Sequence, residues 1–275
     1  MCLVLIAYKT HPDFPLVIAA NRDEFYRRPA SPAAFWPDHP HILGGRDLLR
    51  GGTWLAVDRQ GRLAAVTNYR EPAVQNQNQS LKSRGLLVTD YLFSKDTAQD
   101  YLDDLAERVR EYDGFNLFAG DAVAFFFYGS YLNRSVQLQP GIHGISNGDL
   151  DYPWPKVTRG KQALQALVAD SASPAAESLF AILQDRSVPA DTELPDTGMG
   201  LQMERMLAPV FVTGIDYGTR SSTVLIVNHN GRVDFAERSF GPGGELQNTV
   251  EFEFQIDSRM ETQRHGRHGN KAEGI

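Results

Sequence analysis

The sequence predicts an α+β fold in which helices cover antiparallel sheets. Strand-like runs at both ends of the chain enclose segments with helical spacing, which differs from the regular alternation of a parallel α/β fold. The 275 residues are 42% hydrophobic and 10% aromatic, so the chain can bury a large core. No stretch has the composition of a linker, and we therefore expect residues 1–262 to form a single domain.

The first part of the chain is expected to consist mainly of strands. Apolar runs of strand length occupy residues 2–8, 16–21, 54–58 and 63–68. Turn-forming residues separate these runs, at His11-Pro12-Asp13, Gly44-Gly45, Gly51-Gly52 and Gln60-Gly61. This arrangement predicts antiparallel hairpins.

Helical spacing begins after a polar loop at residues 75–80, with helices expected at 85–94 and 98–112. The second helix carries one apolar stripe, formed by Tyr101, Leu102, Leu105, Val109 and Tyr112. Strands are expected at 115–120, 122–128 and 135–138, and two more helices at 157–169 and 174–183. After a loop at 188–198, the last strands are expected at 210–213, 222–228, 233–240 and 249–255.

The residues at the two ends of the chain show no pattern typical of a membrane segment. The apolar run Leu3–Ala7 has no basic region before it and ends at Lys9, so it is too short for a signal peptide or a membrane span. We therefore expect a soluble, cytoplasmic protein without stable membrane insertion. Residues 263–275 include only two apolar residues, Ala272 and Ile275, and are expected to form a disordered tail.

Composition excludes several classes of partner and site. The chain has 27 basic and 34 acidic residues, and its formal charge of −7 argues against binding nucleic acid or anionic membranes. The single cysteine, Cys2, excludes an intramolecular disulfide and a Cys-rich metal site. His39 and His41 lie close in sequence, but no third ligand follows at a diagnostic spacing, so we expect neither a metal nor another cofactor.

Cys2 is the most informative position in the sequence. A small residue after Met1 generally permits removal of the initiator methionine, which leaves the cysteine with both a thiol and a free α-amine. An α-amine has a reference pKa of about 7.7–8.0, so it can accept the thiol proton without a histidine. The alternative is that Cys2 simply opens a buried strand, as a free cysteine often does.

Polar residues gather at the ends of several predicted strands. Asn21-Arg22-Asp23-Glu24 ends an apolar strand, and burying these side chains is costly unless each is paired. Asn68 and Tyr69 end another strand, Asn147 lies in a turn beside a glycine, and Arg220 precedes an apolar strand. Asn68 and Asn147 could each donate a hydrogen bond to an oxyanion or simply cap a turn. Arg220 could stabilise a thiolate or a substrate carboxylate, or form a structural ion pair.

Seven motifs follow one another along the chain: Met1-Cys2, Asn21-Arg22-Asp23-Glu24, Gly44-Gly45-Arg46-Asp47, Gly51-Gly52-Thr53-Trp54-Leu55, Thr67-Asn68-Tyr69-Arg70, Phe115-Asn116-Leu117 and Tyr217-Gly218-Thr219-Arg220-Ser221-Ser222-Thr223-Val224. Together they resemble the NRDE family, the family of the transport and Golgi organization protein 2 homologues. The resemblance implies an N-terminal-nucleophile (Ntn) hydrolase fold, an αββα sandwich of four layers with two antiparallel sheets between helices. It also implies a link to haem, or to lipid and acyl-CoA, because family members are implicated in handling them.

The chain also resembles, more distantly, the cysteine Ntn amidases of the choloylglycine hydrolase and penicillin V acylase type. This resemblance implies that Cys2 is the nucleophile and that the Asp23 carboxylate holds the α-amine. It also implies that Asn68 and Asn147 are the two amide positions, one of which donates to the oxyanion, and that Arg220 lies near the thiol.

The chain departs from these amidases at Arg22. In the amidases two residues separate the arginine from the aspartate, whereas here Arg22 and Asp23 are adjacent. Neighbours on a regular strand point to opposite faces, so these two side chains cannot both face the nucleophile. Asn21 should then share a face with Asp23, and Arg22 with Glu24.

Two functions are compatible with this sequence. The first is an amidase- or acylase-like hydrolase that cleaves a non-peptide amide or related acyl bond, with catalytic residues Cys2, Asp23, Asn68, Asn147, Arg220 and Arg22, and with substrate contacts from Asn21, Glu24, Trp54 and Tyr69. The alternative is a binding or trafficking protein for haem or lipid and acyl-CoA that uses the same pocket without turnover. In both cases the expected partner is a small molecule, either an acyl compound or an anionic amphipathic ligand.

Overall fold

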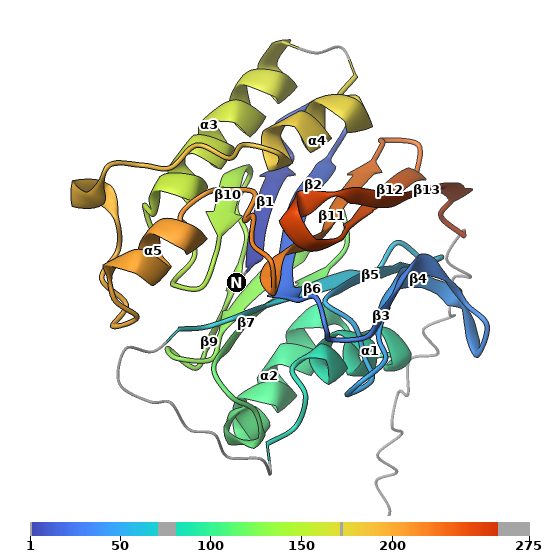
Figure 1. The fold of residues 1–275 in the computed structure, drawn as a ribbon. Coiled ribbons are helices and arrows are strands. Elements are labelled where there is room, and N and C mark those ends of the chain that lie inside the picture. The colour runs from blue at the N-terminus through green and yellow to red at the C-terminus, as the bar shows by residue number, and fades with distance from the viewer. Residues whose placement is uncertain (1, 71–80, 171–172, 258–275) are drawn as a thin grey trace, which may run out of the picture.

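The computed structural model describes residues 2–70, 81–170 and 173–257. Two antiparallel sheets stack face to face, and helices cover the outer face of each sheet (Figure 1). The predicted α+β sandwich is therefore confirmed. The tail expected at residues 263–275 lies outside the described residues.

The first sheet has six strands and begins with the strand that carries Cys2. Its order is β10 (Gly141–Ile145), β1 (Cys2–Tyr8), β2 (Leu16–Phe25), β11 (Tyr217–Val227), β12 (Arg232–Phe240) and β13 (Leu246–Gln255). Between β2 and β10, which both belong to the first sheet, the chain forms all seven strands of the second sheet. Segments far apart in sequence thus meet beside β1.

The second sheet has seven strands in chain order: β3 (Ala30–Trp36), β4 (His39–Asp47), β5 (Leu55–Asp58), β6 (Leu63–Asn68), β7 (Phe115–Gly120), β8 (Phe125–Gly129) and β9 (Arg134–Gln137). One apolar core lies between the sheets and includes side chains from β1, β2, β6 and β11. The strands β1 and β6 come together at the junction of the two sheets (Figure 1).

Helices close the two outer layers. The second sheet is covered by α1 (Gly85–Phe93) and α2 (Ala98–Arg108), which bury Leu87, Tyr91, Tyr101, Leu102 and Leu105 against it. The first sheet is covered by α3 (Pro155–Asp170) and α4 (Ala176–Leu183). A shorter helix, α5 (Leu201–Leu207), follows the long loop. None of the helices in the described ranges is long and apolar enough to cross a bilayer.

Several predicted elements differ from the structure. The sequence patterns do not predict the strands β3, β4 and β10, and the strand expected at 210–213 is wrong. There the amide of Phe211 donates to the carbonyl of Asp185 (2.8 Å) and that of Val212 to the Thr219 hydroxyl (2.9 Å), so no strand ladder forms. Val210, Phe211 and Val212 are nevertheless buried, so this apolar run resembles a strand in sequence.

The glycine pair predicted as a turn lies inside β4. A Cβ at Gly45 would come within 2.2 Å of the Trp54 ring, and one at Gly44 within 2.7 Å of Ala56. These two glycines therefore serve close packing inside the sheet, and their φ angles need not be positive.

Candidate functional site

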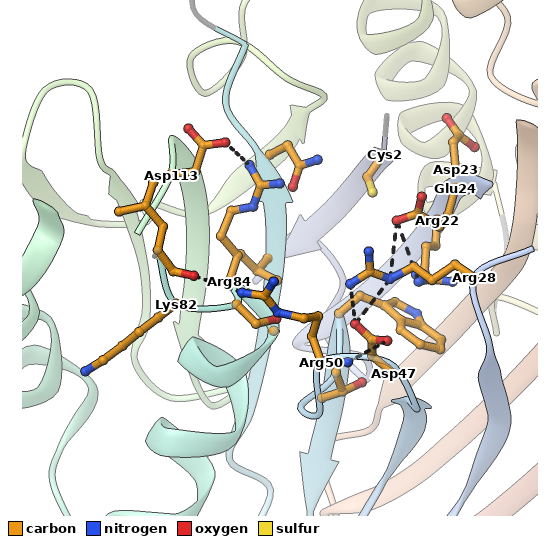
Figure 2. Close-up of a pocket in the computed structure, with 17 residues that line it drawn as sticks. Cys2, Arg22, Asp23, Glu24, Arg28, Asp47, Arg50, Lys82, Arg84 and Asp113 are labelled. Carbon is orange, nitrogen blue, oxygen red and sulfur yellow. Dashed lines mark hydrogen bonds and ion pairs between the residues drawn. The ribbon is translucent and has the colours of Figure 1, made fainter. Parts of the chain in front are cut away.

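A cavity of about 280 Å³ lies over the start of β1, where the two sheets meet (Figure 2). It is lined by the ends of β1, β2, β4 and β6 and by residues 81–85, which lead into α1. The structure brings six of the predicted site residues to this cavity: Cys2, Arg22, Asp23, Glu24, Trp54 and Asn68. It does not bring Asn21, Tyr69, Asn147 or Arg220 there.

Cys2 opens β1 and its thiol faces the cavity (Figure 2). Burial raises the pKa of this thiol and the Asp23 carboxylate raises it further, while the backbone amide of Asp23 and the Arg22 guanidinium lower it. At neutral pH the thiol is therefore protonated. It needs a base before it can act as a nucleophile.

Arg22 lies opposite Cys2 in the β1–β2 register, and the two side chains share the face between the sheets. The guanidinium is buried and sits over the Trp54 ring, 4.3 Å from its centroid. Glu24, on the same face of β2, lies 3.9 Å from it. Stacking and charge thus hold Arg22 beside the thiol.

Asp23 points to the other face of β2, beneath the helices. Its Oδ1 accepts a hydrogen bond from the Thr219 hydroxyl at 2.8 Å, and the residue is buried. Burial raises the pKa of this carboxyl, and the nearby Lys156 ammonium opposes that effect. Because backbone atoms lie in the plane of a sheet, a carboxylate on this face can still approach the nitrogen of Cys2.

The two asparagines have different surroundings. Asn68 ends β6 and its exposed side chain lines the cavity. Asn147 is buried, and its Nδ2 donates to the carbonyl of Asn68 at 2.6 Å. The neighbouring Ser146 hydroxyl donates to the carbonyl of Cys2 at 2.8 Å. Residues 146–147 thus tie the start of β1 to the end of β6.

Arg220 supports the backbone near the cavity. Its Nη1 donates to the carbonyls of Phe25, Tyr26 and Arg28 at 2.9–3.0 Å. The register of β11 shifts between Thr219 and Ser221, so Arg220 is the extra residue of a bulge. The guanidinium therefore holds the loop that carries Arg28 into the cavity.

The predicted substrate contacts also divide between cavity and scaffold. Asn21 donates to the carbonyls of Leu183 and Val210 at 2.8 and 2.9 Å and accepts from the Ser222 hydroxyl, so its amide is used in holding α4 to the sheet. Tyr69 stacks on Tyr131 away from the cavity, with centroids 5.1 Å apart.

Sequence reasoning missed much of the charge at this site. The cavity is also lined by Arg28, Asp47, Arg50, Lys82, Arg84 and Asp113, which Figure 2 shows on both sides of the opening. Asp47 and the glycines beside Arg50 belong to motifs noted above, but nothing in the local pattern marks Arg84. Residues 81–85 reach the site only because the second sheet brings α1 there.

Ion pairs order this charged lining. Arg28 binds Asp47 through Nη2 at 2.6 Å, and although burial opposes the effect, this contact lowers the pKa of the Asp47 carboxyl. Across the cavity Arg84 lies 3.6 Å from Asp113 and donates to the carbonyl of Gly114. Within the described part of the chain, no cluster of three or more His, Cys, Asp or Glu side chains could hold a metal ion.

Comparison with known proteins identifies the relatives of this chain. The model of the family "Transport and Golgi organisation 2" matches residues 1–242. The Transport and Golgi organization protein 2 homolog of Bos taurus is 35% identical, covering 94% of this chain and 100% of the bovine protein. The Homo sapiens homolog is 36% identical, covering 87% of this chain and 93% of the human protein.

Among solved structures, a mutant conjugated bile acid hydrolase from Clostridium perfringens is similar, with a TM-score of 0.51 at 8% identity. The match covers 93% of this chain and 92% of the other. This likeness confirms the predicted Ntn-hydrolase fold. The family match and the bovine and human relatives show that the chain belongs to the Transport and Golgi organisation 2 (NRDE) family.

Proposed function

We propose that this protein is an N-terminal cysteine hydrolase that cleaves a non-peptide amide or related acyl bond. One observation carries the proposal: the thiol of Cys2 opens into a cavity with Arg22 beside it and Asn68 at the rim, and Asp23 lies behind the same strand end. An Ntn hydrolase needs this grouping of nucleophile, carboxylate and amide donor.

In the proposed reaction, removal of Met1 frees the α-amine of Cys2, which accepts the thiol proton. The thiolate forms a bond to the substrate carbonyl carbon, and the carbonyl electron pair moves to oxygen. Asn68 and backbone amides donate to this oxyanion. When the oxyanion collapses, the C–N bond breaks and the leaving amine takes the proton from the α-ammonium. Water then hydrolyses the thioester by the same route.

The roles of the remaining residues follow from their contacts. Arg22 stabilises the thiolate. The Trp54 ring and the Glu24 carboxylate hold the guanidinium of Arg22 in place. Asp23 orients the α-amine. Asn147 and Arg220 position the cavity walls, and neither lines the cavity itself. The name of the solved neighbour describes hydrolysis of a conjugated bile acid, which is of the same reaction class, although the likeness itself concerns the fold.

A second candidate function is binding or transport of an anionic amphipathic ligand, such as haem or a lipid or acyl-CoA, without turnover. The observation that favours it is that Arg50 and Arg84 line the cavity, whereas the ammonium of Lys82 is paired with Glu111 at 2.5 Å. These two arginine side chains suit a carboxylate or phosphate, and hydrolysis does not require them.

Intact-mass measurement and thiol labelling test the proposed hydrolase. We expect purified protein to lack Met1 and to react with iodoacetamide at pH 7 faster than an ordinary thiol with a pKa of about 8.5. Incubation with simple N-acyl amides or acyl esters should leave an acyl adduct on Cys2. Retention of Met1 would contradict the proposal, because the nitrogen of Cys2 would then be part of a peptide bond. Slow labelling together with a haem-type absorbance on titration with haemin would favour the binding function.

A further inference from the structure

Two buried polar residues of the second sheet have no role in the reaction described above. Thr67 of β6 is 1% exposed and Asn116 of β7 is 0% exposed. They lie directly opposite each other in the β6–β7 register, so their side chains point to the same face of the sheet. Neither residue lines the cavity. Burying a hydroxyl and an amide is costly unless both are hydrogen bonded, so their partners indicate their role.

Both side chains bind the loop that follows β10 of the first sheet. The Thr67 hydroxyl donates to the carbonyl of Ser146 at 2.8 Å. Nδ2 of Asn116 donates to the carbonyl of Gly148 at 2.9 Å. The same Nδ2 also donates to the Thr67 hydroxyl at 3.3 Å, so the two side chains form one hydrogen-bonded pair.

The loop carbonyl between these two is bound as well. The carbonyl of Asn147 accepts from the backbone amide of Arg70, which follows β6, at 2.7 Å. Three consecutive carbonyls, those of residues 146–148, therefore accept hydrogen bonds from β6, from β7 and from the segment after β6. Together these bonds fix the position and the orientation of the loop relative to the second sheet.

The side chains of the same loop bind the two strand ends that carry the proposed nucleophile and oxyanion donor. Ser146 Oγ donates to the carbonyl of Cys2 at 2.8 Å. Nδ2 of Asn147 donates to the carbonyl of Asn68 at 2.6 Å. The loop thus contacts the start of β1 and the end of β6 at once, and the spacing of Cys2 and Asn68 depends on how the loop is held.

We propose that Thr67 and Asn116 are positioning residues that hold residues 146–148, so that the Cys2 thiol and the Asn68 side chain keep the spacing that acyl transfer requires. This inference rests on the proposed function, because it concerns the geometry between nucleophile and oxyanion donor. A displacement of about 1 Å between reacting groups can reduce a rate about 10²-fold. Alkylation of the thiol by iodoacetamide forms no oxyanion, so its rate does not depend on this spacing.

Matched variants test the inference in the full-length protein. Thr67→Val and Asn116→Leu each remove a donor to the loop at nearly constant volume. Thr67→Ser keeps the hydroxyl, and Thr89→Val removes a buried hydroxyl that donates to a carbonyl inside α1. Each variant is also combined with Asn68→Ala. Two rates are measured: release of nitrophenol from p-nitrophenyl acetate, with Cys2→Ala as the blank, and alkylation of Cys2 by iodoacetamide as a function of pH.

We expect Thr67→Val and Asn116→Leu to reduce nitrophenol release about tenfold to a hundredfold, while the rate and pH dependence of alkylation stay as in the wild type. Thr67→Ser and Thr89→Val should match the wild type in both rates. In the Asn68→Ala background, Thr67→Val should cost less than about threefold, because the donor whose position it sets is already absent.

Two results would overturn the inference. One is nitrophenol release at the wild-type rate in a folded Thr67→Val variant. The other is an equal loss with and without Asn68→Ala, because a substitution that only loosens the fold acts independently of the oxyanion donor.

Ser146→Ala provides a second test in case Thr67→Val and Asn116→Leu do not fold. It removes the hydrogen bond to Cys2 and leaves the three loop carbonyls bound. Nitrophenol release should fall in the wild-type background and much less with Asn68→Ala, and equal losses would overturn the inference. Failure of the proposed function gives a different result, namely retained Met1 or no Cys2-dependent release in the wild type, and that result would remove both proposals together.

Discussion

Single residues at the start of β1 and the end of β2 decide the chemistry of the cavity. Cys2 and Arg22 share one face of the sheet, and Asp23 occupies the other. The nucleophile therefore has a guanidinium on its own side and a carboxylate behind it. In the proposed reaction this division separates two tasks: Arg22 stabilises the thiolate, and Asp23 orients the α-amine.

Replacing Arg22 by methionine should slow alkylation of Cys2 at pH 7 by about threefold to tenfold, because loss of the nearby cation raises the thiol pKa. The measurement is the rate of iodoacetamide labelling as a function of pH. Arg27→Met is a matched control, since Arg27 is exposed and lies over the Phe25 ring. Equal rates in the two variants would rule out a role for Arg22 at the thiol.

The two asparagines should respond differently to substitution by alanine. Asn68→Ala should reduce hydrolysis by about 10²–10³-fold, the effect of losing one oxyanion donor in other enzymes, while stability stays close to wild type. Asn147→Ala should instead lower the free energy of unfolding by about 1–3 kcal/mol, because the buried Asn147 side chain donates to the Asn68 carbonyl and this bond is lost. Turnover of an N-acyl amide and urea unfolding measure the two effects. The reverse pattern would assign the oxyanion to Asn147.

At the scale of elements, short connecting segments hold the cavity walls together. Residues 146–147 link β1 to β6, and the bulge at Arg220 in β11 holds the loop after β2. Neither Asn147 nor Arg220 lines the cavity. Both connections instead fix the relative positions of the strand ends that do line it.

Arg220→Met should lower the free energy of unfolding by about 2 kcal/mol, because three carbonyls lose a charged donor. Thiol labelling of the folded variant should slow by less than in Arg22→Met, since the cavity lining does not include Arg220. Urea unfolding and iodoacetamide kinetics measure these effects. A large kinetic effect in a variant of normal stability would place Arg220 at the thiol after all.

Gly45→Ala should disturb the site from a distance along β4. The added methyl group would meet the Trp54 ring, so Trp54 must move off Arg22, at a cost of about 1–3 kcal/mol of stability. Tryptophan fluorescence, thermal unfolding and Cys2 labelling should all change. Gly51→Ala is the control, because a methyl group there meets nothing within 4 Å and adds only the strain of a positive φ.

At the scale of the whole molecule, a buried carboxyl joins the two sheets. Glu237 of β12 accepts from the amide of Ala33 in β3 at 2.7 Å and from the Thr223 hydroxyl at 3.1 Å. Burial raises its pKa to about 7. The folded state therefore holds this proton more tightly than the unfolded state does.

The sign of the resulting pH dependence follows from this shift. The stabilisation from Glu237 is fully present below its unfolded pKa of 4.5 and is lost as the pH rises through about 7. We expect the free energy of unfolding to fall by at most about 3 kcal/mol between pH 5 and 8, and Glu237→Gln to remove much of that fall. Urea unfolding at pH 5 and pH 8 measures this change in the free energy of unfolding. Glu177→Gln is the control, because the Glu177 side chain is exposed. An unchanged pH dependence in Glu237→Gln would exclude this origin.

Local patterns in the sequence predict much of the fold. The four longer helices begin within two residues of the predicted positions, and α2 shows the clearest apolar stripe, with Tyr101, Leu102 and Leu105 buried on one side. The strands β3, β4 and β10 lack a continuous apolar run, since they contain proline, histidine and glycine. They become strands because neighbouring strands complete their hydrogen bonds.

By itself, the sequence determined the fold class, the family resemblance and the position of Cys2 at the cavity, because periodicity and ordered motifs are local properties of the chain. It also determined that Arg22 and Asp23 face opposite ways, since alternation is built into a strand. Only the tertiary structure decided that Arg84 lines the cavity while Arg220 and Asn147 bind backbone carbonyls outside the lining. Those roles depend on which distant segments two stacked sheets bring together, and spacing along the chain carries no information about that contact.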